Sequence, residues 1–232
     1  MNADAAVATW SPIVELRQYE LKPGQRDVLI ELFDREFVES QEAFGMKLIG
    51  QFRAIDHPDR FVWVRGFPDM LTRGRALEAF YGGPVWRQHS AAANATMLNV
   101  DNVLMLRPAR AGSGFVLADE RPAPESTTIP DGLVVATTYR ADEPDAEGFA
   151  TSLERALADA GVSTLAVFVT ENAPNNFPAL PVRDEEQVVV SFTAFADERA
   201  YERHAQPFPE LCDEVLRLRP TSRSLCVADP VR

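Results

Sequence analysis

Three short segments in the first half of the chain carry charged, polar and aromatic side chains at alternate positions. Arginines bind carboxylates and enolates through paired hydrogen bonds, and aromatic rings supply apolar contact area. A tyrosine or glutamate beside them would handle a proton. The pattern predicts a pocket for a small, partly apolar molecule bearing a carbonyl or carboxylate. The candidate catalytic residues are Tyr19 and Glu15, and the candidate substrate-binding residues are Arg17, Gln51, Arg53, Trp63 and Arg65.

These seven residues are predicted to share one face of a sheet, because successive strand residues point to opposite sides. The opposite face collects a more apolar set, which we expect to lie under helices: Val14, Leu16, Val62 and Val64. The charged set would then occupy the bare face of the sheet. A second interpretation is a polar face whose glutamate–arginine pairs lie at an interface between subunits. Both interpretations stay open at this point.

Histidine chemistry has one further candidate. His89 follows Trp86 by three residues on a predicted helix, so the two side chains would share a face. We take His89 as a candidate catalytic residue and Trp86 as a candidate substrate-binding residue. His57 lies in a predicted turn and His204 near a proline break, where solvated or packed histidines are the simpler interpretation.

Cofactor motifs are missing from the sequence. The three histidines and two cysteines lack metal-ligand spacing, so no metal is expected. There is no P-loop or GxGxxG turn, which argues against nucleotide cofactors, and no GxSxG nucleophile elbow. We expect no cofactor, although a single axial ligand such as His89 leaves haem open.

Six elements are predicted in the first half. Strands are expected over Ile13–Leu21, 46–54, 61–67 and 102–107. A helix is expected over 25–44, where Leu29, Phe33 and Phe37 recur every four residues. A second helix begins at Asp69 and breaks at the Gly82-Gly83-Pro84 stretch before resuming to about residue 95. The order is β-α-β-β-α-β.

The second half is predicted to repeat this order after a linker rich in proline and glycine. Its expected strands are Leu133–Arg140, 163–171, 187–195 and 221–227, with helices over 146–160 and from Asp197 onward. The predicted boundaries are a first domain over 12–108, a linker over 109–131 and a diverged second domain over 132–230.

A β-α-β-β-α-β unit is the ferredoxin-like arrangement, an antiparallel sheet with both helices on one face. The predicted fold class is therefore α+β, with tandem ferredoxin-like domains. Two such sheets packed face to face would cover each other's bare faces. The two sheets would come either from the halves of one chain or from two chains.

Several of these stretches resemble the NIPSNAP family. They are Glu15 to Gly24 (ELRQYELKPG), Gly50 to Arg53 (GQFR), Phe61 to Trp63 (FVW) and Phe80 to Trp86 (FYGGPVW). The resemblance covers residues 12–108, and the second half looks like a diverged copy. It implies the dimeric α+β barrel superfamily, which includes cofactor-free monooxygenases, isomerases and haem enzymes. It also implies assembly, so we expect a homo-oligomer.

Composition and charge limit the partners. The formal net charge of −12 argues against nucleic acid and anionic membranes. The first 110 residues hold 13 basic and 14 acidic side chains, so the acidic excess lies in the second half. No apolar run reaches the roughly 18 residues of a membrane span, no secretory signal is evident, and two cysteines fit a reducing cytoplasm.

The leading functional prediction is a cytoplasmic protein that binds a small-molecule ligand inside an α+β barrel. If it is an enzyme, we expect a cofactor-independent isomerase or oxygenase whose arginines stabilise an enolate. The alternative is a non-catalytic interaction or scaffolding protein whose sheet face is used for assembly.

Overall fold

The computed structural model describes residues 11–117, 120–141, 145–184 and 186–228. The strands are β1 Ile13–Leu21, β2 Lys47–Ala54, β3 Arg60–Phe67, β4 Met97–Pro108, β5 Leu133–Arg140, β6 Ser163–Thr170, β7 Val188–Phe195 and β8 Cys212–Pro220. The helices are α1 Arg26–Leu32, η1 Phe33–Phe37, α2 Val38–Glu42, α3 Met70–Tyr81, α4 Pro84–Thr96, α5 Ala146–Asp159 and α6 Glu198–Glu202. The fold is mixed α+β, as the sequence predicted.

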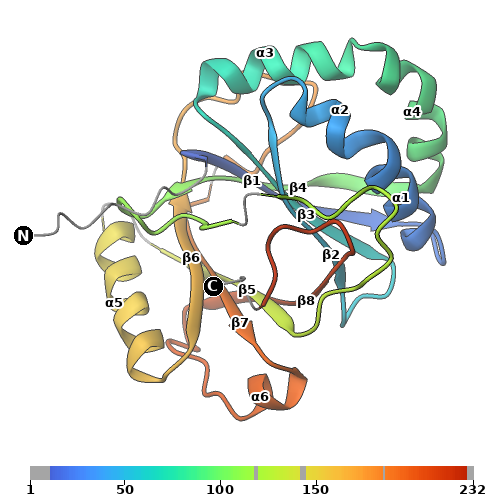
Figure 1. Ribbon diagram of the computed structural model, residues 1–232. Coiled ribbons are helices and arrows are strands. Elements are labelled where there is room, and N and C mark those ends of the chain that lie inside the picture. Colours follow the sequence, from blue (N-terminus) through green and yellow to red (C-terminus); the bar gives the residue numbers. More distant parts are fainter. Residues whose placement is uncertain (1–10, 118–119, 142–144, 185, 229–232) are drawn as a thin grey trace, which may run out of the picture.

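The eight strands form one closed antiparallel barrel in the order β1-β3-β2-β8-β5-β7-β6-β4. The first half contributes β4-β1-β3-β2 and the second half β8-β5-β7-β6, so both halves follow the same strand order. Two seams join them, where β2 pairs with β8 and β4 pairs with β6. Helices α1 to α4 lie together against the first-half strands, and α5 lies on the opposite side of the barrel (Figure 1).

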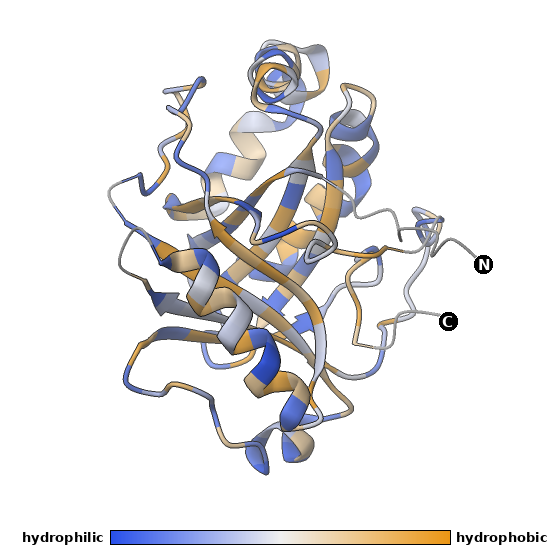
Figure 2. Cartoon of the chain, turned by 90° about the vertical axis from the view of Figure 1, so that its left-hand side faces the viewer, coloured by the Kyte–Doolittle hydropathy of each residue, from blue (hydrophilic) through white to orange (hydrophobic). Residues whose placement is uncertain are grey.

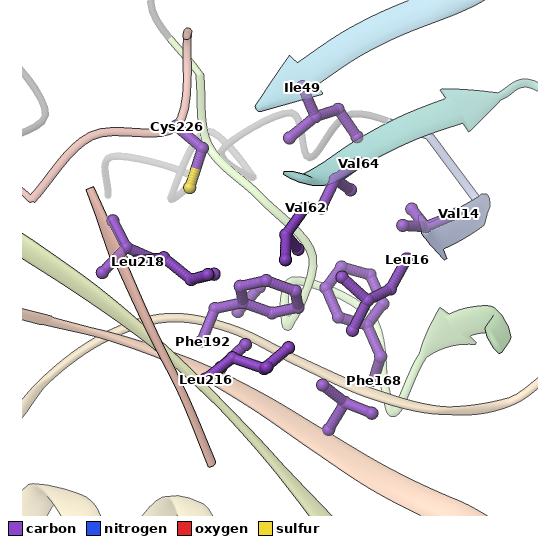
Figure 3. Close-up of a cluster of buried hydrophobic side chains, with 14 of the residues drawn as sticks. Val14, Leu16, Ile49, Val62, Val64, Phe168, Phe192, Leu216, Leu218 and Cys226 are labelled. Atoms are coloured by element: carbon purple, nitrogen blue, oxygen red, sulfur yellow. The ribbon is translucent and has the colours of Figure 1, made fainter. Parts of the chain in front are cut away.

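The barrel interior is an apolar core to which all eight strands contribute. Figure 3 shows its central side chains, among them Val14, Leu16, Val62, Val64 and Phe192. Phe115, from the segment between the halves, and Cys226, from the segment after β8, also pack into this core. Side chains therefore fill the space inside the barrel.

This packing corrects the predicted assignment of sheet faces. We expected Val14, Leu16, Val62 and Val64 under the helices, but they point into the barrel. Tyr19 and Trp63 instead pack in the cluster that contains the helices α1 to α4. The expectation failed because both faces of this sheet are buried, and the barrel interior takes the more aliphatic set. The amphipathic set lies between sheet and helices, where polar side chains from both layers can pair.

A bulge in β2 determines the face of Ile49. Simple alternation would place Ile49 with Gln51 and Arg53, but the pairing of β2 with β3 shifts by one residue between Leu48 and Gly50. Ile49 therefore points into the barrel. Glycine is required at position 50, because a Cβ there would lie 2.4 Å from the ring of Phe52.

The first predicted helix is interrupted. The α-helix over Arg26–Leu32 gives way to one turn of π-helix, η1, before α2 resumes. Such π-helical turns are rare and frequently occur at functional sites. The helices carry hydrophilic and hydrophobic residues side by side (Figure 2), and the buried apolar side chains of the first-half helices pack with those of the sheet.

The second half differs from the prediction at its end. The predicted closing strand over 221–227 is wrong, since the last strand is β8, Cys212–Pro220. The residues after it run past the bulge in β2, where Thr221 donates its backbone N–H to Gln51 and Cys226 donates to Ile49. The last two residues of the predicted second domain, 229 and 230, lie outside the described residues. No helix in the described ranges is long and apolar enough to cross a membrane.

Candidate functional site

The seven predicted site residues of β1, β3 and β2 form three rows on the helix-facing side of these strands. The strand register places Glu15 opposite Arg65, and Tyr19 opposite Phe61. The central row runs from Arg17 through Trp63 to Gln51, since each is the direct cross-strand neighbour of the next. The structure therefore brings the predicted residues together, although between barrel wall and helices and not inside the barrel.

Glu15 is the centre of a buried ion-pair cluster. Its carboxylate lies 2.8 Å from Arg17, 2.8 Å from Arg65 and 2.7 Å from Arg73 of α3. All four side chains are fully buried. Arg65 also donates to Gln41 Oε1 at 3.0 Å. We call Glu15 and its three arginines the arginine cluster.

The arginine cluster carries more positive than negative charge. Three guanidinium groups meet one carboxylate, which leaves two positive charges without a buried counter-ion in the cluster. Burial by itself would raise the pKa of Glu15, but the attraction of Arg65, Arg17 and Arg73 lowers that pKa well below its usual range. Burial lowers the pKa of Arg73. Glu15 is therefore ionised at neutral pH and is a poor proton acceptor, which argues against its predicted catalytic role.

Tyr19 is hydrogen-bonded to the arginine cluster through Arg17. Its hydroxyl oxygen accepts a hydrogen bond from Arg17 Nε at 3.2 Å. Burial raises the pKa of Tyr19 despite the opposing effect of Arg17. The phenol therefore stays protonated at neutral pH and has a hydrogen to donate.

The central row holds buried polar atoms without a hydrogen-bond partner. These atoms are Nη2 of Arg17, Nε1 of Trp63, and both the oxygen and the nitrogen of the Gln51 amide. Nη2 of Arg73 is also unpartnered. Leaving such groups unpaired in the interior costs free energy, and a polar molecule that bonded to them would offset that cost.

Aromatic side chains cover the central row. The ring of Phe33, from η1, lies 4.9 Å from that of Trp63 and packs edge-on against it. The Arg17 guanidinium lies 5.4 Å from the centre of the Trp63 ring, and Arg65 lies 5.0 Å from it. A flat molecule in this layer would meet aromatic surface and positive charge together.

Two members of this site were missed in the sequence, although a signal exists for each. Arg73 occupies the apolar stripe of α3 with Ala76, Leu77 and Phe80, and a charged residue in such a stripe is unusual. Gln41 follows Phe33 and Phe37 at the same four-residue interval. Its buried amide donates to the Phe37 carbonyl and accepts from Arg65.

Three predicted site residues lie away from the arginine cluster. Arg53 is partly exposed and pairs with Asp27 at 2.7 Å. Trp86 packs among the helix aromatics, against Phe37, Phe80 and Tyr81. His89 Nε2 lies 3.5 Å from Glu36, and its ring packs against Phe37. His89 therefore has its contacts apart from the arginine cluster.

The remaining histidines are also apart. His57 is exposed in the turn before β3, and His204 packs against Phe195 in the second half. Burial lowers the pKa of His204. In the part of the chain that the structure describes, no group of three histidine, cysteine or acidic side chains is placed to hold a metal ion.

Asp34, in η1, is a partly buried carboxyl that the sequence did not reveal. It lines a groove of about 440 Å³ between the helices and the segments 124–129 and 221–223. Its Oδ1 is buried without a hydrogen-bond partner. Burial raises the pKa of Asp34 to about 6, against smaller opposing effects of Thr221 and Arg223.

This raised pKa predicts a pH-dependent effect of Asp34→Asn. Because the folded-state pKa lies above the usual value of 3.8, wild-type stability is full below that value and falls as the pH rises through about 6. Asparagine resembles the neutral carboxyl and avoids this loss. We expect the variant to be about 1–2 kcal/mol more stable at pH 8 and equal to wild type near pH 4, as measured by urea unfolding. Glu31→Gln, an exposed change in the same groove, is the control. A difference that does not vary with pH would contradict this account.

Comparison with known proteins supports the fold. A candidate monooxygenase of Fusobacterium nucleatum has a TM-score of 0.59 and 12% identity over 96% of this chain and 98% of its own. A candidate monooxygenase of Lactobacillus acidophilus has a TM-score of 0.56 and 15% identity over 96% of this chain and 100% of its own. Both likenesses span the whole barrel, so they show that this α+β barrel fold occurs in other proteins.

The family comparison concerns the first half. The NIPSNAP family model matches residues 14–110, the part of the chain in which the sequence resemblance was found. A NIPSNAP family protein of unknown function from Agrobacterium tumefaciens is 21% identical over 43% of this chain and 90% of its own, with a TM-score of 0.40. No curated protein matches the chain.

Proposed function

We propose that the protein binds a small, partly apolar anion, a carboxylate or an enolate, between the first-half sheet and its helices. The observation that carries this proposal is the charge of the arginine cluster. Three fully buried arginines face one glutamate, so two positive charges lack a buried counter-ion in the cluster. Burying an unpaired charge is costly, and an anionic ligand would remove that cost.

The unpartnered atoms describe the ligand further. Arg17 and Trp63 offer hydrogen-bond donors, and Gln51 offers one donor group and one acceptor. A carboxylate or enolate oxygen would accept from the donors, while a hydroxyl on the ligand would satisfy the Gln51 oxygen. The aromatic surface of Trp63 and Phe33 favours a planar, partly apolar body.

If the protein is an enzyme, this site fits chemistry through an enolate. Arg17, Arg65 and Arg73 would stabilise the negative charge, and protonated Tyr19 would donate a hydrogen bond to it. Isomerisation and cofactor-independent oxygenation both pass through such an anion. The likeness to two candidate monooxygenases accords with the second class. Neither reaction needs His89 at the arginine cluster.

The scaffolding alternative needs an open sheet face. Helices of the same chain cover the outer face of the first-half sheet, and the strands of the second half face its inner side. This arrangement favours ligand binding over assembly through the sheet. The predicted cytoplasmic setting and homo-oligomeric state stay predictions.

We also propose that the halves are tandem ferredoxin-like units, with the predicted boundaries at 12–108 and 132–230. Their identical strand order supports this, because each half places its first strand between its third and fourth. The barrel would then be the single-chain counterpart of two ferredoxin-like sheets that meet between two chains.

A thermal-shift experiment tests ligand binding. The probes are benzoate, salicylate and phenylacetate, with benzamide and benzylamine as neutral and cationic controls of similar shape. We expect at least one carboxylate at about 10 mM to raise the melting temperature by about 2–4 °C, with no shift for the controls. Calorimetry should then give one carboxylate per chain. If no carboxylate shifts the melting temperature, or if the amine shifts it equally, the proposal is wrong.

A further inference from the structure

The arginine cluster is sealed from solvent. Glu15, Arg17, Arg65 and Arg73 have no exposed side-chain surface, and Trp63 is almost completely buried. A ligand that enters this layer must displace part of the protein. Strands of a closed barrel cannot move aside without breaking their ladders, so the moving part must lie on the helix side.

One covering segment comes from the other half of the chain. Residues 171–184, which we call the β6–β7 segment, leave the second-half strand β6 and pass along α3 of the first half. Asn175 and Asn176 each accept a hydrogen bond from Arg73 Nη1, at 3.0 and 2.7 Å through their side-chain oxygens. The second half thus contacts the arginine cluster directly.

Further contacts hold the β6–β7 segment against the first half. The ring of Phe177 stacks on that of Tyr81, with 5.8 Å between ring centres and 25° between planes. The Asn176 side chain donates to the backbone oxygen of Met70 at the start of α3. The backbone N–H of Arg183 donates to the Val103 carbonyl at 2.8 Å. The described residues of the segment form no helix or strand.

We propose that the β6–β7 segment is the removable cover of the anion site, and that Asn175 and Asn176 are positioning residues that hold Arg73 until a ligand enters. This inference rests on the proposed function. The amide oxygens of Asn175 and Asn176 are neutral hydrogen-bond acceptors for Arg73. A carboxylate ligand would offer Arg73 a charged acceptor in their place. Nη2 of Arg73 stays unpartnered beneath them, ready for the ligand.

The other covering elements are held more firmly. Helices α1 to α2 reach the sheet through fully or nearly fully buried side chains, including Leu29, Phe33 and Phe37. Moving them would expose much of the apolar cluster. The β6–β7 segment contributes only two partly buried apolar side chains to that cluster, Phe177 and Leu180. Displacing it exposes less apolar surface, and its hydrogen bonds can be replaced by water.

A substitution at Gly74 of α3, which the β6–β7 segment packs against, would weaken the cover without changing the segment itself. A Cβ at position 74 would lie 2.8 Å from Asn176 Nδ2, too close for van der Waals contact. Gly74→Ala therefore forces the Asn176 side chain away from Arg73 and Met70. Alanine also favours the helix over glycine, so α3 itself should not be weakened.

Two readouts test the cover. In a background with Trp10 and Trp86 replaced by phenylalanine, Trp63 is the remaining tryptophan. Quenching of its fluorescence by acrylamide, a neutral molecule, reports access without requiring ligand binding. Stopped-flow association of benzoate, or of whichever of the three carboxylates binds, reports entry of the anion.

We expect Gly74→Ala and Asn176→Ala each to raise the acrylamide quenching constant and the association rate by about threefold or more. The controls are Arg75→Ala, an exposed change on α3, and Ala179→Ser, an exposed change in the β6–β7 segment. Both should stay close to the parent protein. Melting temperatures close to that of the parent would show that Gly74→Ala and Asn176→Ala open the cover without global unfolding.

The outcomes separate the two proposals. Carboxylate binding with quenching and association rates that match the controls would overturn the cover and leave the proposed function standing. Faster quenching in Gly74→Ala and Asn176→Ala, with no carboxylate bound by any variant, would support the cover and contradict the function. Unchanged quenching with no binding would contradict both.

Discussion

Replacing Glu15 with glutamine is expected to lower the free energy of unfolding by about 3–5 kcal/mol, the usual cost of removing one partner from a buried ion pair. Glu15 is the carboxylate that Arg17, Arg65 and Arg73 share, at 2.7–2.8 Å. Glutamine keeps the shape but removes the charge, so three buried guanidinium groups would repel one another without compensation. Urea unfolding at pH 7 measures the loss.

The pH dependence of this effect follows from the lowered pKa of Glu15. Because its folded-state pKa lies below the usual value of 4.5, its stabilising contribution is complete above that value and is lost as the pH falls toward the folded-state pKa. The difference between wild type and Glu15→Gln should therefore shrink on acidification below about pH 4.5. Glu36→Gln, a partly exposed member of a surface pair, should cost less than about 1 kcal/mol. If the free energy of unfolding of Glu15→Gln equalled that of Glu36→Gln, the charge of Glu15 would not be what stabilises the arginine cluster.

Replacing Arg17 with glutamine is expected to weaken carboxylate binding by about 10–100-fold, the usual worth of a hydrogen bond to a charged group. Arg17 combines an unpartnered Nη2 with contact to the Trp63 ring at the centre of the proposed site. Glu15 keeps Arg65 and Arg73 as partners, so its charge stays compensated and the variant should fold. Calorimetric titration with the carboxylate found in the thermal-shift experiment measures the change.

Arg53→Gln is the matched control for this prediction. Arg53 belonged to the same predicted set, but it is partly exposed near the end of β2 and pairs with Asp27. We expect its affinity for the carboxylate to stay within about twofold of wild type, since a screened surface charge contributes little. If both variants lost the same carboxylate affinity, the carboxylate would be attracted by the general positive charge and would not occupy a defined site at Arg17.

The elements of the first half were largely predictable, because their hydrophobic periods are regular. Apolar and polar residues alternate over most of Ile13–Leu21, and the stripe through Leu29, Phe33 and Phe37 marks a helix. Closure of the barrel could not be predicted in the same way. Both faces of the first-half sheet are buried, one in the barrel core and one against the helices. Alternation tells which residues share a face but not which face meets the helices. For that reason the grouping of Glu15, Arg17 and Tyr19 was right while their location was wrong.

The second half was harder because its last strand lacks a clear pattern. Cys212–Pro220 mixes charged and apolar residues, as only its inward side chains enter the core. The apolar stretch that was predicted as the closing strand instead runs along the β2 bulge and places Cys226 in the core. Asn175 and Asn176 were missed for a different reason. They reach Arg73 through contacts between segments that are distant in sequence, which no local pattern records.

The seams of the barrel have a consequence for folding kinetics. Just beyond the paired residues of β2 and β8, Arg217 donates to Asp56 at 2.8 Å across 161 residues of chain. Within each half, paired strands are nearer in sequence than β2 and β8 are, so their pairing loses less chain entropy. Closure of the β2–β8 seam therefore belongs to the late stages of folding, after the four strands of each half have paired. The β6–β7 segment can reach Arg73 only once the halves have met, so the arginine cluster is sealed at the end of that process.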